Sequence, residues 1–389
     1  MDQGQRTYLD YNATAPLRPR ARDALVSALA LVGNASSVHG EGRRVRALVE
    51  GARDSVARLV GASARDVIFT SGGTEASALA LSPGFRRRSG ASPELLLVGA
   101  GEHPCVLDGH RFPADRVERI PLRDDGLVDL VWLQARLARH DGGPALVSIQ
   151  LANNETGIIQ PVAEAAAIAR AHGGLIHTDA VQAAGKIAVS IAGLGVDALS
   201  LSAHKLGGPQ GVGALVLAGD DYEIAPLLRG GGQERSRRAG TENAAGIAAF
   251  GAVAQDASDD LDTESARLLA MRAAFEAEIR RITPDVVFFG EEEQRLPGTI
   301  LFAVPGRKAE TALISLDLAG AALSSGSACS SGKVKRSHVL DAMGVPADLA
   351  ECALRLSFGW ATCEDDVIRF SRAFEKAMSS RSVQEFRAA

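Results

Sequence analysis

The feature that most constrains this chain is a regular alternation of short apolar runs and amphipathic segments through its first two-thirds. The runs have the length of strands, and several are almost continuous in Val, Ile and Leu, as strands buried on both faces require. They span residues 67–70, 94–98, 145–151, 175–178, 198–201 and 213–217. Two predicted helices flank or separate these runs. Apolar residues at helical spacing indicate the first, at 45–60, and the second spans 162–172 and ends at Gly173. This alternation predicts an α/β fold in which helices flank a mostly parallel sheet.

The pattern changes near an acidic patch at residues 256–262, which we interpret as a hinge or domain edge. The segments after it are a helix at 263–282, strands at 286–289 and 299–304, a helix at 308–318, a Gly/Ser loop at 324–332, a strand at 354–358 and a helix at 364–379. This order predicts a smaller α+β domain. We therefore divide the chain into a large domain, residues 16–258, and a small domain built from residues 1–15 and 259–389.

Composition excludes several classes of protein. Hydrophobic residues make up 46% and charged residues 23% of the 389 residues, which excludes a disordered chain. The formal net charge of -5 gives no reason to expect direct binding of nucleic acid. We expect no membrane partner and a cytoplasmic location, because no apolar run approaches the roughly 20 residues of a membrane span and no secretory signal is visible. The four cysteines form no CxxC pair, so we expect neither a disulfide framework nor a metal site.

The segment SGGTE, residues 71–75, follows the strand at 67–70 and opens a predicted helix. Glycine lets the backbone approach a ligand, and the free N–H groups at a helix start favour a phosphate. Gly73 and Thr74 are therefore candidate phosphate-binding residues. An ordinary tight turn between a strand and a helix fits the same residues.

Two further segments follow buried strands. In HTDAVQ, residues 177–182, Asp179 stands where open α/β sheets place ligand contacts, and a protonated heterocyclic nitrogen would supply the cation that a buried carboxylate needs. In LSAHKLGGPQGVG, residues 201–213, Lys205 is one of only six lysines, and a desolvated lysine can form a Schiff base with an aldehyde cofactor. Ser202 and His204 can donate to a phosphate. The alternatives are a helix N-cap for Asp179 and a surface turn for Lys205.

Histidine and cysteine supply the remaining candidates. His103 follows the strand at 94–98 and could stack on a planar ring or move protons, although a turn histidine fits equally well. Cys105 is more typical of a small buried residue at a helix start. Cys329 stands in SSGSACSSG, residues 324–332, whose serines and glycines cannot form a packed core, so we expect an exposed loop with a reactive thiol. Cys352 and Cys363 are expected in the core.

Together these segments resemble the fold-type I pyridoxal 5'-phosphate (PLP) enzymes, and more closely the cysteine desulfurases of the NifS/IscS type in the class V aminotransferase group. The resemblance runs in order through YLDYNATAP (8–16), GNASSVHGEG (33–42), SGGTE, EHP, NNETG (153–157), HTDAVQ, SAHK, GGGQERSRRAGTEN (230–243), SSGSACSSG and RLSFG (355–359). Its most specific part is the cysteine in the serine/glycine loop combined with the lysine motif. The chain departs from the family pattern at Ser77 and Ala78, where an asparagine often stands, and at Cys105.

The resemblance implies a role for each candidate and a fold in which the large domain binds PLP and the small domain carries the catalytic cysteine loop. The residues expected to bind PLP are Gly73, Thr74, Ser202 and His204 at its phosphate, Asp179, Gln182, His103 and Asn154 at its ring, and Lys205 as a Schiff base. Thr241 is expected to reach the phosphate of a neighbouring subunit, which implies a homodimer.

The resemblance also implies how the substrate is handled. Arg355 is expected to bind the carboxylate of L-cysteine through a bidentate contact, with help from Asn12 and with Asn154 touching the ring or the substrate. Cys329 is expected to attack the substrate sulfur, which leaves a persulfide and releases alanine. Lys205 and His103 are the expected proton carriers.

Three functions stay open at this point. The first is a cysteine desulfurase that passes sulfur to an acceptor or iron–sulfur scaffold protein, for cluster assembly, tRNA thiolation or other thiolation. The second is a selenocysteine lyase or another class V aminotransferase-type enzyme, which would not need the Cys329 loop. The third is a non-catalytic binding protein, which would need none of Lys205, Asp179, Cys329 and Arg355.

Overall fold

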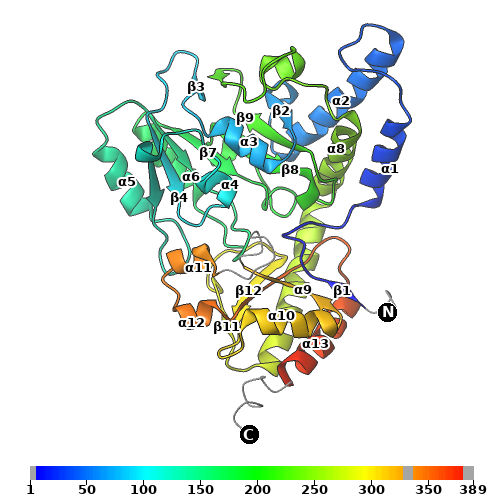
Figure 1. The fold of residues 1–389 in the computed structure, drawn as a ribbon, viewed down its shortest axis with the longest axis vertical. Helices are drawn as coiled ribbons and strands as arrows, with labels where there is room; N and C mark the ends of the chain where they lie inside the picture. Colours follow the sequence, from blue (N-terminus) through cyan, green and yellow to red (C-terminus); the bar gives the residue numbers. More distant parts are fainter. Residues whose placement is uncertain (1–5, 327–335, 380–389) are drawn as a thin grey trace.

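The structure, a computed structural model, describes residues 6–326 and 336–379. Figure 1 shows a large body above a smaller one. The large body is built on a seven-stranded sheet and the smaller body on a four-stranded sheet. The N-terminal segment joins the smaller body, because β1 (Thr7–Tyr8) pairs in parallel with β13 (Ala321–Ala322). The division of the chain at residues 15/16 and 258/259 stays a prediction.

The large sheet has the strand order β2-β9-β8-β7-β6-β4-β5. Its strands are β2 (Val67–Thr70), β4 (Leu95–Gly99), β5 (Val117–Ile120), β6 (Ala145–Ser148), β7 (Leu175–Asp179), β8 (Ala198–Ser202) and β9 (Gly213–Leu217). β4 to β8 run parallel, whereas β9 is antiparallel to both of its neighbours, β8 and β2. β2 therefore points the same way as β8, and its carboxyl end lies at the same edge of the sheet.

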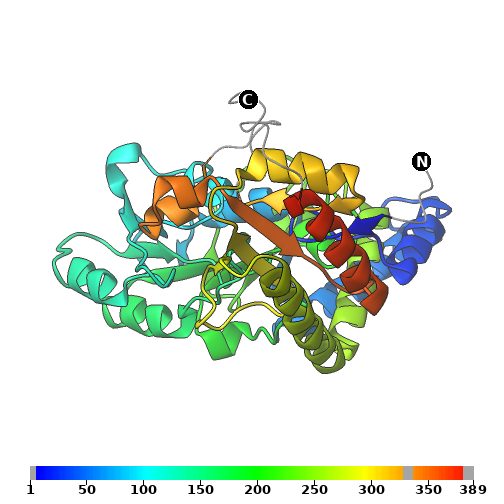
Figure 2. The same cartoon turned by 90° about the horizontal axis from the view of Figure 1, so that it is seen from below.

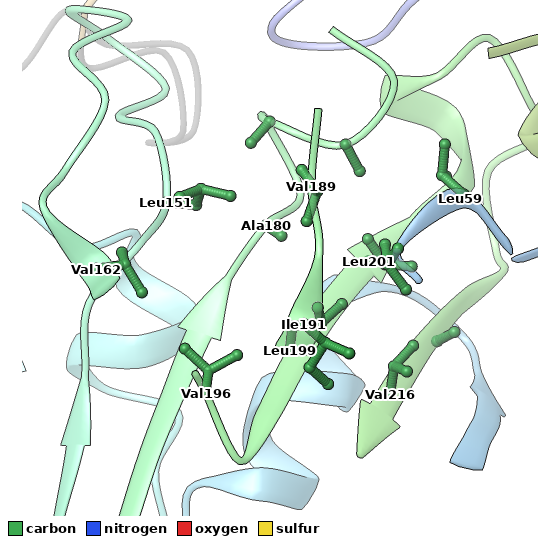
Figure 3. Close-up of a cluster of buried hydrophobic side chains, with 14 of the residues drawn as sticks. Leu59, Leu151, Val162, Ala180, Val189, Ile191, Val196, Leu199, Leu201 and Val216 are labelled. Atoms are coloured by element: carbon green, nitrogen blue, oxygen red, sulfur yellow. The ribbon is translucent and has the colours of Figure 1, made fainter. Parts of the chain in front are cut away.

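Both faces of this sheet are buried, which explains the near-continuous apolar runs. Within β2, Val67 and Phe69 join one hydrophobic core and Ile68 joins the other. The helices that supply the first core are α1 (Pro19–Leu29), α2 (Gly40–Leu59), α5 (Leu130–Ala138), α6 (Val162–Ala171), α7 (Ile191–Leu194) and α8 (Ala244–Asp259). The second core is covered by α3 (Gly73–Ala80) and α4 (Pro104–Leu107). Figure 3 shows part of the first core, where Leu199 and Val216 project from neighbouring strands. The predicted α/β fold with a mostly parallel, helix-flanked sheet is confirmed.

The smaller body has an antiparallel sheet in the order β11-β12-β15-β14. Its strands are β11 (Val287–Phe288), β12 (Thr299–Ala303), β14 (Ser324–Ser325) and β15 (Ala353–Ser357). One face packs on α9 (Leu261–Ile282), α10 (Ala309–Leu318) and α13 (Glu364–Ser379), seen from below in Figure 2. The other face packs on the short helices α11 (His338–Ala342) and α12 (Ala347–Ala350). Phe275, Phe370 and Phe374 form an aromatic cluster in the first of these cores.

The acidic patch at 256–262 is mostly helical, since α8 runs to Asp259 and α9 begins at Leu261. α8 packs in a core of the larger body and α9 in a core of the smaller one, and the interpretation of the patch as a hinge or domain edge stays a prediction. One local expectation is wrong. Cys363 is exposed rather than in the core, because it immediately precedes α13, where its backbone N–H donates to Asp366 Oδ2 at 2.9 Å. Cys352 is buried as expected. Within the described residues, no helix has the length and apolar character needed to cross a bilayer.

Candidate active site

The carboxyl ends of several large-sheet strands open into one cavity of about 410 Å³. The predicted site residues that line it are Asn12, Gly73, Thr74, His103, Asn154, Asp179, Gln182, Ser202, His204, Lys205 and Arg355. Most of them follow β2, β4, β6, β7 or β8, whereas Arg355 comes from β15 of the smaller body and Asn12 from the segment after β1. Because its lining residues come from both bodies, the cavity lies where the two bodies meet.

Among the predicted site residues that the structure describes, Thr241 alone does not line this cavity. Thr241 lines a separate cavity of about 120 Å³, together with Ser71 and Gly211. Its expected role involves the neighbouring subunit and stays a prediction. Cys329 lies outside the described residues.

Asp179 ends β7 and is almost buried, with 9% of its surface exposed. Its Oδ1 accepts a hydrogen bond from the Val181 backbone N–H at 2.9 Å, so it caps a turn and not a helix. Burial raises the pKa of Asp179 to about 6, and the nearby charge of Lys205 opposes that shift. A further cation beside this carboxylate would favour its ionised form.

Lys205 ends a short 3-10 turn, Ala203–Lys205, that follows β8 directly. Its Nζ donates to the backbone oxygens of Asn12 at 2.6 Å and Ala13 at 2.8 Å. It lines the cavity, which excludes the alternative of a lysine in a surface turn. The amine is thus held at the junction between the large sheet and the N-terminal segment.

The phosphate-binding candidates surround the start of α3. Gly73 is the first residue of this helix, and a Cβ there would lie 2.8 Å from Val181 Cγ2, so a larger residue would not fit without displacement. Thr74 and Ser202 bring hydroxyl groups to the same cavity. Burial, and then the charge of Lys205, lowers the pKa of His204 to about 4, so this imidazole is neutral at pH 7. Hydroxyl groups and free helix N–H groups are the chemistry that a phosphate requires.

His103 is both the N-cap of α4 and part of the cavity wall. Its Nδ1 accepts from the Cys105 backbone N–H at 3.1 Å. Burial, reinforced by the charge of Lys205, lowers the pKa of His103 to about 4. The ring is therefore neutral at pH 7, and with Nδ1 accepting, its proton is on Nε2.

Arg355 lines the cavity from β15 of the smaller body and is only 2% exposed. Its Nη2 donates to Asp10 Oδ1 at 2.8 Å and its Nη1 to the backbone oxygen of Asn154 at 3.0 Å. Its Nε is buried with no hydrogen-bond partner among the described residues. Asn12 Nδ2 donates to Asn154 O at 3.1 Å and to Thr299 Oγ1 at 3.0 Å, so both N–H groups of this amide are occupied. The contribution of Asn12 to substrate binding stays a prediction.

The donor set fits PLP. The start of α3 provides a close backbone approach at Gly73, where only a glycine leaves room beside Val181. Asp179 provides a buried carboxylate. Burial raises its pKa, and a neighbouring cation such as a protonated ring nitrogen would stabilise its ionised form. Lys205 provides an amine inside the same cavity. These are the three groups that an anionic, aldehyde-bearing pyridine requires.

Sequence reasoning missed several residues that the structure brings to the site. Gln150 and Cys105 line the cavity, Asp10 binds Arg355, and Lys186 donates to Gln182 and Asn12. Asp10 lies in YLDYNATAP, one of the motifs that carry the family resemblance. The scarcity of lysine, which drew attention to Lys205, applies equally to Lys186.

Comparison with known proteins agrees with this site. The profile of the family "Aminotransferase class-V" matches residues 7–370, so the chain belongs to that family. Cysteine desulfurase IscS from Dictyoglomus turgidum is 39% identical, with 93% of this chain and 92% of the relative covered. The IscS-like cysteine desulfurase from Mycobacterium tuberculosis is 40% identical, with 92% and 93% covered. Within the class the chain therefore belongs to the cysteine desulfurases.

Solved structures agree with this assignment. The NifS-like protein from Rickettsia africae superposes with a TM-score of 0.88 at 33% identity, over 96% of this chain and all of that one. SspA, solved in complex with cysteine, has a TM-score of 0.76 at 26% identity, over 90% of this chain and 98% of that one. The predicted family and the predicted PLP fold type are confirmed.

Proposed function

We propose that this chain is a PLP-dependent cysteine desulfurase, which takes sulfur from L-cysteine and releases L-alanine. The convergence of Lys205, Asp179 and Arg355 on one cavity carries this proposal, because the three come from different elements and supply an amine, a carboxylate and a guanidinium. The similar protein SspA has a solved structure in complex with cysteine, which supports L-cysteine as the proposed substrate.

The residues divide into a cofactor end and a substrate end. Gly73, Thr74, Ser202 and His204 would hold the phosphate, and Asp179 would pair with the ring nitrogen. Gln182 would contact the phenolic oxygen of the ring, while His103 and Asn154 would contact the ring itself. Lys205 Nζ would hold the cofactor covalently. PLP, once bound, supplies an electron sink next to the substrate's carbon atoms.

The substrate end selects an amino acid. Arg355 would bind the carboxylate, and its buried, unpartnered Nε is a donor that this carboxylate can satisfy. Lys205 Nζ, freed from the Asn12 and Ala13 carbonyls, would take a proton from the substrate and return one to it. The neutral His103 carries its proton on Nε2 and can donate it.

The sulfur step balances without an added oxidant or reductant. The thiolate of Cys329 would attack the substrate sulfur, so an S–S bond forms while the C–S bond breaks. The electron pair of the C–S bond stays with the substrate carbon, which then takes up a proton. The products are L-alanine and a persulfide on Cys329, and the persulfide passes to a sulfur acceptor or iron–sulfur scaffold protein. Free thiols at Cys105, Cys352 and Cys363 fit a reducing compartment such as the cytoplasm.

The proposed assembly is a homodimer in which segment 230–243 lies at the interface. Thr241 is apart from the cavity of its own chain, as a residue that serves a neighbouring subunit would be. Light scattering should give twice the chain mass. A monomer that holds PLP and turns over cysteine would contradict the dimer.

The deciding experiment is mass spectrometry after incubation with L-cysteine. The purified protein should be yellow, release alanine and gain one sulfur atom. Cys329→Ser should keep its colour but gain no sulfur, because a hydroxyl is a poor nucleophile at neutral pH. The matched controls Cys105→Ser, Cys352→Ser and Cys363→Ser should all gain sulfur. A colourless wild-type protein that forms no alanine would contradict the proposed function.

A further inference from the structure

A second lysine, Lys186, contacts two residues of the cavity wall. Its Nζ donates to Gln182 Oε1 at 2.8 Å and to Asn12 Oδ1 at 3.1 Å. Both partners are buried and neutral, with 6% and 3% of their surfaces exposed. Burial, and then the charges of Lys205 and Arg355, lowers the pKa of Lys186 to about 7. Lys186 is half-buried, and an ammonium held by amides and flanked by other cations is unusual, since such groups are normally paired with carboxylates.

The contacts of Lys186 fix which way two amides face. At pH values below about 7, where Lys186 is an ammonium group, it can only donate hydrogen bonds, so both amide oxygens point toward it. The Nε2 of Gln182 then faces away from Lys186 and donates to the backbone oxygen of Asn12 at 3.0 Å. That bond uses one of its two N–H groups, which leaves the other for a ligand in the cavity that Gln182 lines.

The same contacts hold Asn12 in place. With its Oδ1 on Lys186, Asn12 directs its Nδ2 to Asn154 and Thr299 and its backbone oxygen to the amine of Lys205. Lys186 thus contacts both the Gln182 amide, which faces the cavity, and the side chain of Asn12, whose backbone carbonyl accepts from Lys205.

A purely structural role would be served at lower cost by another residue. Methionine has similar length and could fill the same space without the desolvation cost of a buried charge. It would also avoid the repulsion that Lys205 and Arg355 exert on Lys186. An arrangement that costs stability beside a cavity of polar groups is typical of a functional site.

We propose that Lys186 is a positioning residue, which acts by holding the Gln182 amide with its free N–H directed into the cavity. This inference rests on the proposed function, in which the group facing Gln182 is the phenolic oxygen of the PLP ring. An N–H in this position favours the deprotonated form of that oxygen. If Lys186 is removed, the amide can rotate and present its own oxygen there.

The pH dependence of the visible absorbance of the PLP-loaded protein tests this role. Lys186→Met should raise the apparent pKa at which the visible band changes by about one unit. The loss of the hydrogen-bond donor removes a contact that stabilises the deprotonated chromophore, so the protonated form is favoured. The matched control is Lys308→Met, which removes an exposed lysine whose partner is Glu351, and it should leave the band unchanged. Lys186→Ala is a second variant, since water can enter the vacated space and support the fold.

A double-mutant cycle separates positioning from simple charge. Gln182→Leu should raise the apparent pKa by itself, and adding Lys186→Met to it should change the band by less than about a quarter of a unit. Fully additive shifts, or an unshifted band in Lys186→Met, would overturn the proposal. So would loss of folding in both Lys186 variants, because Lys186 would then serve the fold as a whole. A wild-type protein with no visible band would instead contradict the proposed function itself.

Discussion

The cavity at the junction of the two bodies and the segment at residues 230–243 are held in place by different means. In the cavity, Asp179 and Ser202 end strands of the large sheet, and Arg355 lies within a strand of the small sheet. Segment 230–243 instead depends on side-chain ion pairs. Arg53 binds Glu234 through two hydrogen bonds of 2.7 and 2.8 Å.

The backbone of this segment is also strained. Glu234, Arg235 and Ser236 have φ values of 46°, 56° and 65°, a conformation that costs about 1–2 kcal/mol for each residue that is not glycine. The carboxylate of Glu234 also accepts a hydrogen bond from the Phe69 backbone N–H at 3.0 Å, and this bond offsets part of the strain. A second ion pair joins Arg238 to Glu75 of α3 at 2.9 Å. Groups on strand ends thus keep their place through the sheet, whereas this segment keeps its place through a few specific side chains.

The largest effect should come from the cavity. Lys205→Ala should lower alanine formation by at least about 1,000-fold, because it removes the amine that holds the cofactor and moves the proton. The readout is visible absorbance, together with the mass of any adduct fixed by borohydride. A fixed adduct in this variant would move the covalent link to another lysine, with Lys186 the first to be tested.

The next effect should come from segment 230–243. Arg53→Met leaves Glu234 as an unpaired buried carboxylate, which should lower the free energy of unfolding by about 3–5 kcal/mol in urea titrations. Arg44→Met, which removes an exposed partner of Glu41 from the same helix, should change it by less than about 1 kcal/mol. In Arg53→Met, PLP affinity should fall by no more than about tenfold, which is the loss expected if the one hydrogen bond predicted from Thr241 is broken. A larger loss of affinity would mean that segment and cavity are not held independently.

A smaller effect separates substrate binding from packing. Arg355→Ala should raise the half-saturation concentration of L-cysteine by about ten- to a hundred-fold, because a charge-assisted contact to the carboxylate is lost. PLP affinity should stay within about threefold of the wild-type value. Arg295→Ala is the matched control, since Arg295 is also buried and paired, with Glu276, but does not line the cavity. An equal change in half-saturation for both variants would place the carboxylate contact elsewhere.

The smallest effect concerns pH. The pKa of Asp179 is raised to about 6, so its carboxylate becomes protonated as the pH falls through 6 and can no longer pair with a protonated ring nitrogen. Titrations of the apoprotein with PLP should show up to about tenfold weaker binding at pH 5 than at pH 7. The Asp179→Asn variant should bind PLP more weakly than the wild type at both pH values, and its PLP affinity should not show this change between pH 5 and pH 7. The same pH dependence in both proteins would assign it to another group.

The sequence could predict much of the fold and most of the cavity for one physical reason. Buried strands leave a strong apolar signal, and parallel strands deliver the residues after them to one edge of the sheet. β2 and β9 match their predicted limits, and Asp179 and Lys205 lie together as expected. The limits of β4, β6, β7 and β8 differ from the predicted ones by one to three residues, because the end of pairing depends on neighbouring strands. The edge strand β5 has no predicted counterpart.

What could not be predicted depends on contacts between distant segments. Asp10 and Lys186 matter only because folding brings them to Arg355 and Gln182, and no local pattern records those contacts. The helical limits within the acidic patch at 256–262 also depend on such contacts, because the packed apolar face of α8 keeps the chain helical to Asp259. The position of Thr241 depends on ion pairs such as Arg238–Glu75, which spacing alone does not indicate.

The pairing of the N-terminal segment with the small sheet has a consequence for biosynthesis. Asn12 donates its backbone N–H to Ser357 Oγ, a residue 345 positions later in the chain. At about 5–20 residues per second, the ribosome needs roughly 17–70 s to make the chain between them. The stretch that includes Asn12 therefore waits while the seven-stranded sheet is being made, and the catalytic cavity closes only when β15 emerges. A cofactor that arrives during translation would meet Lys205 well before it meets Arg355.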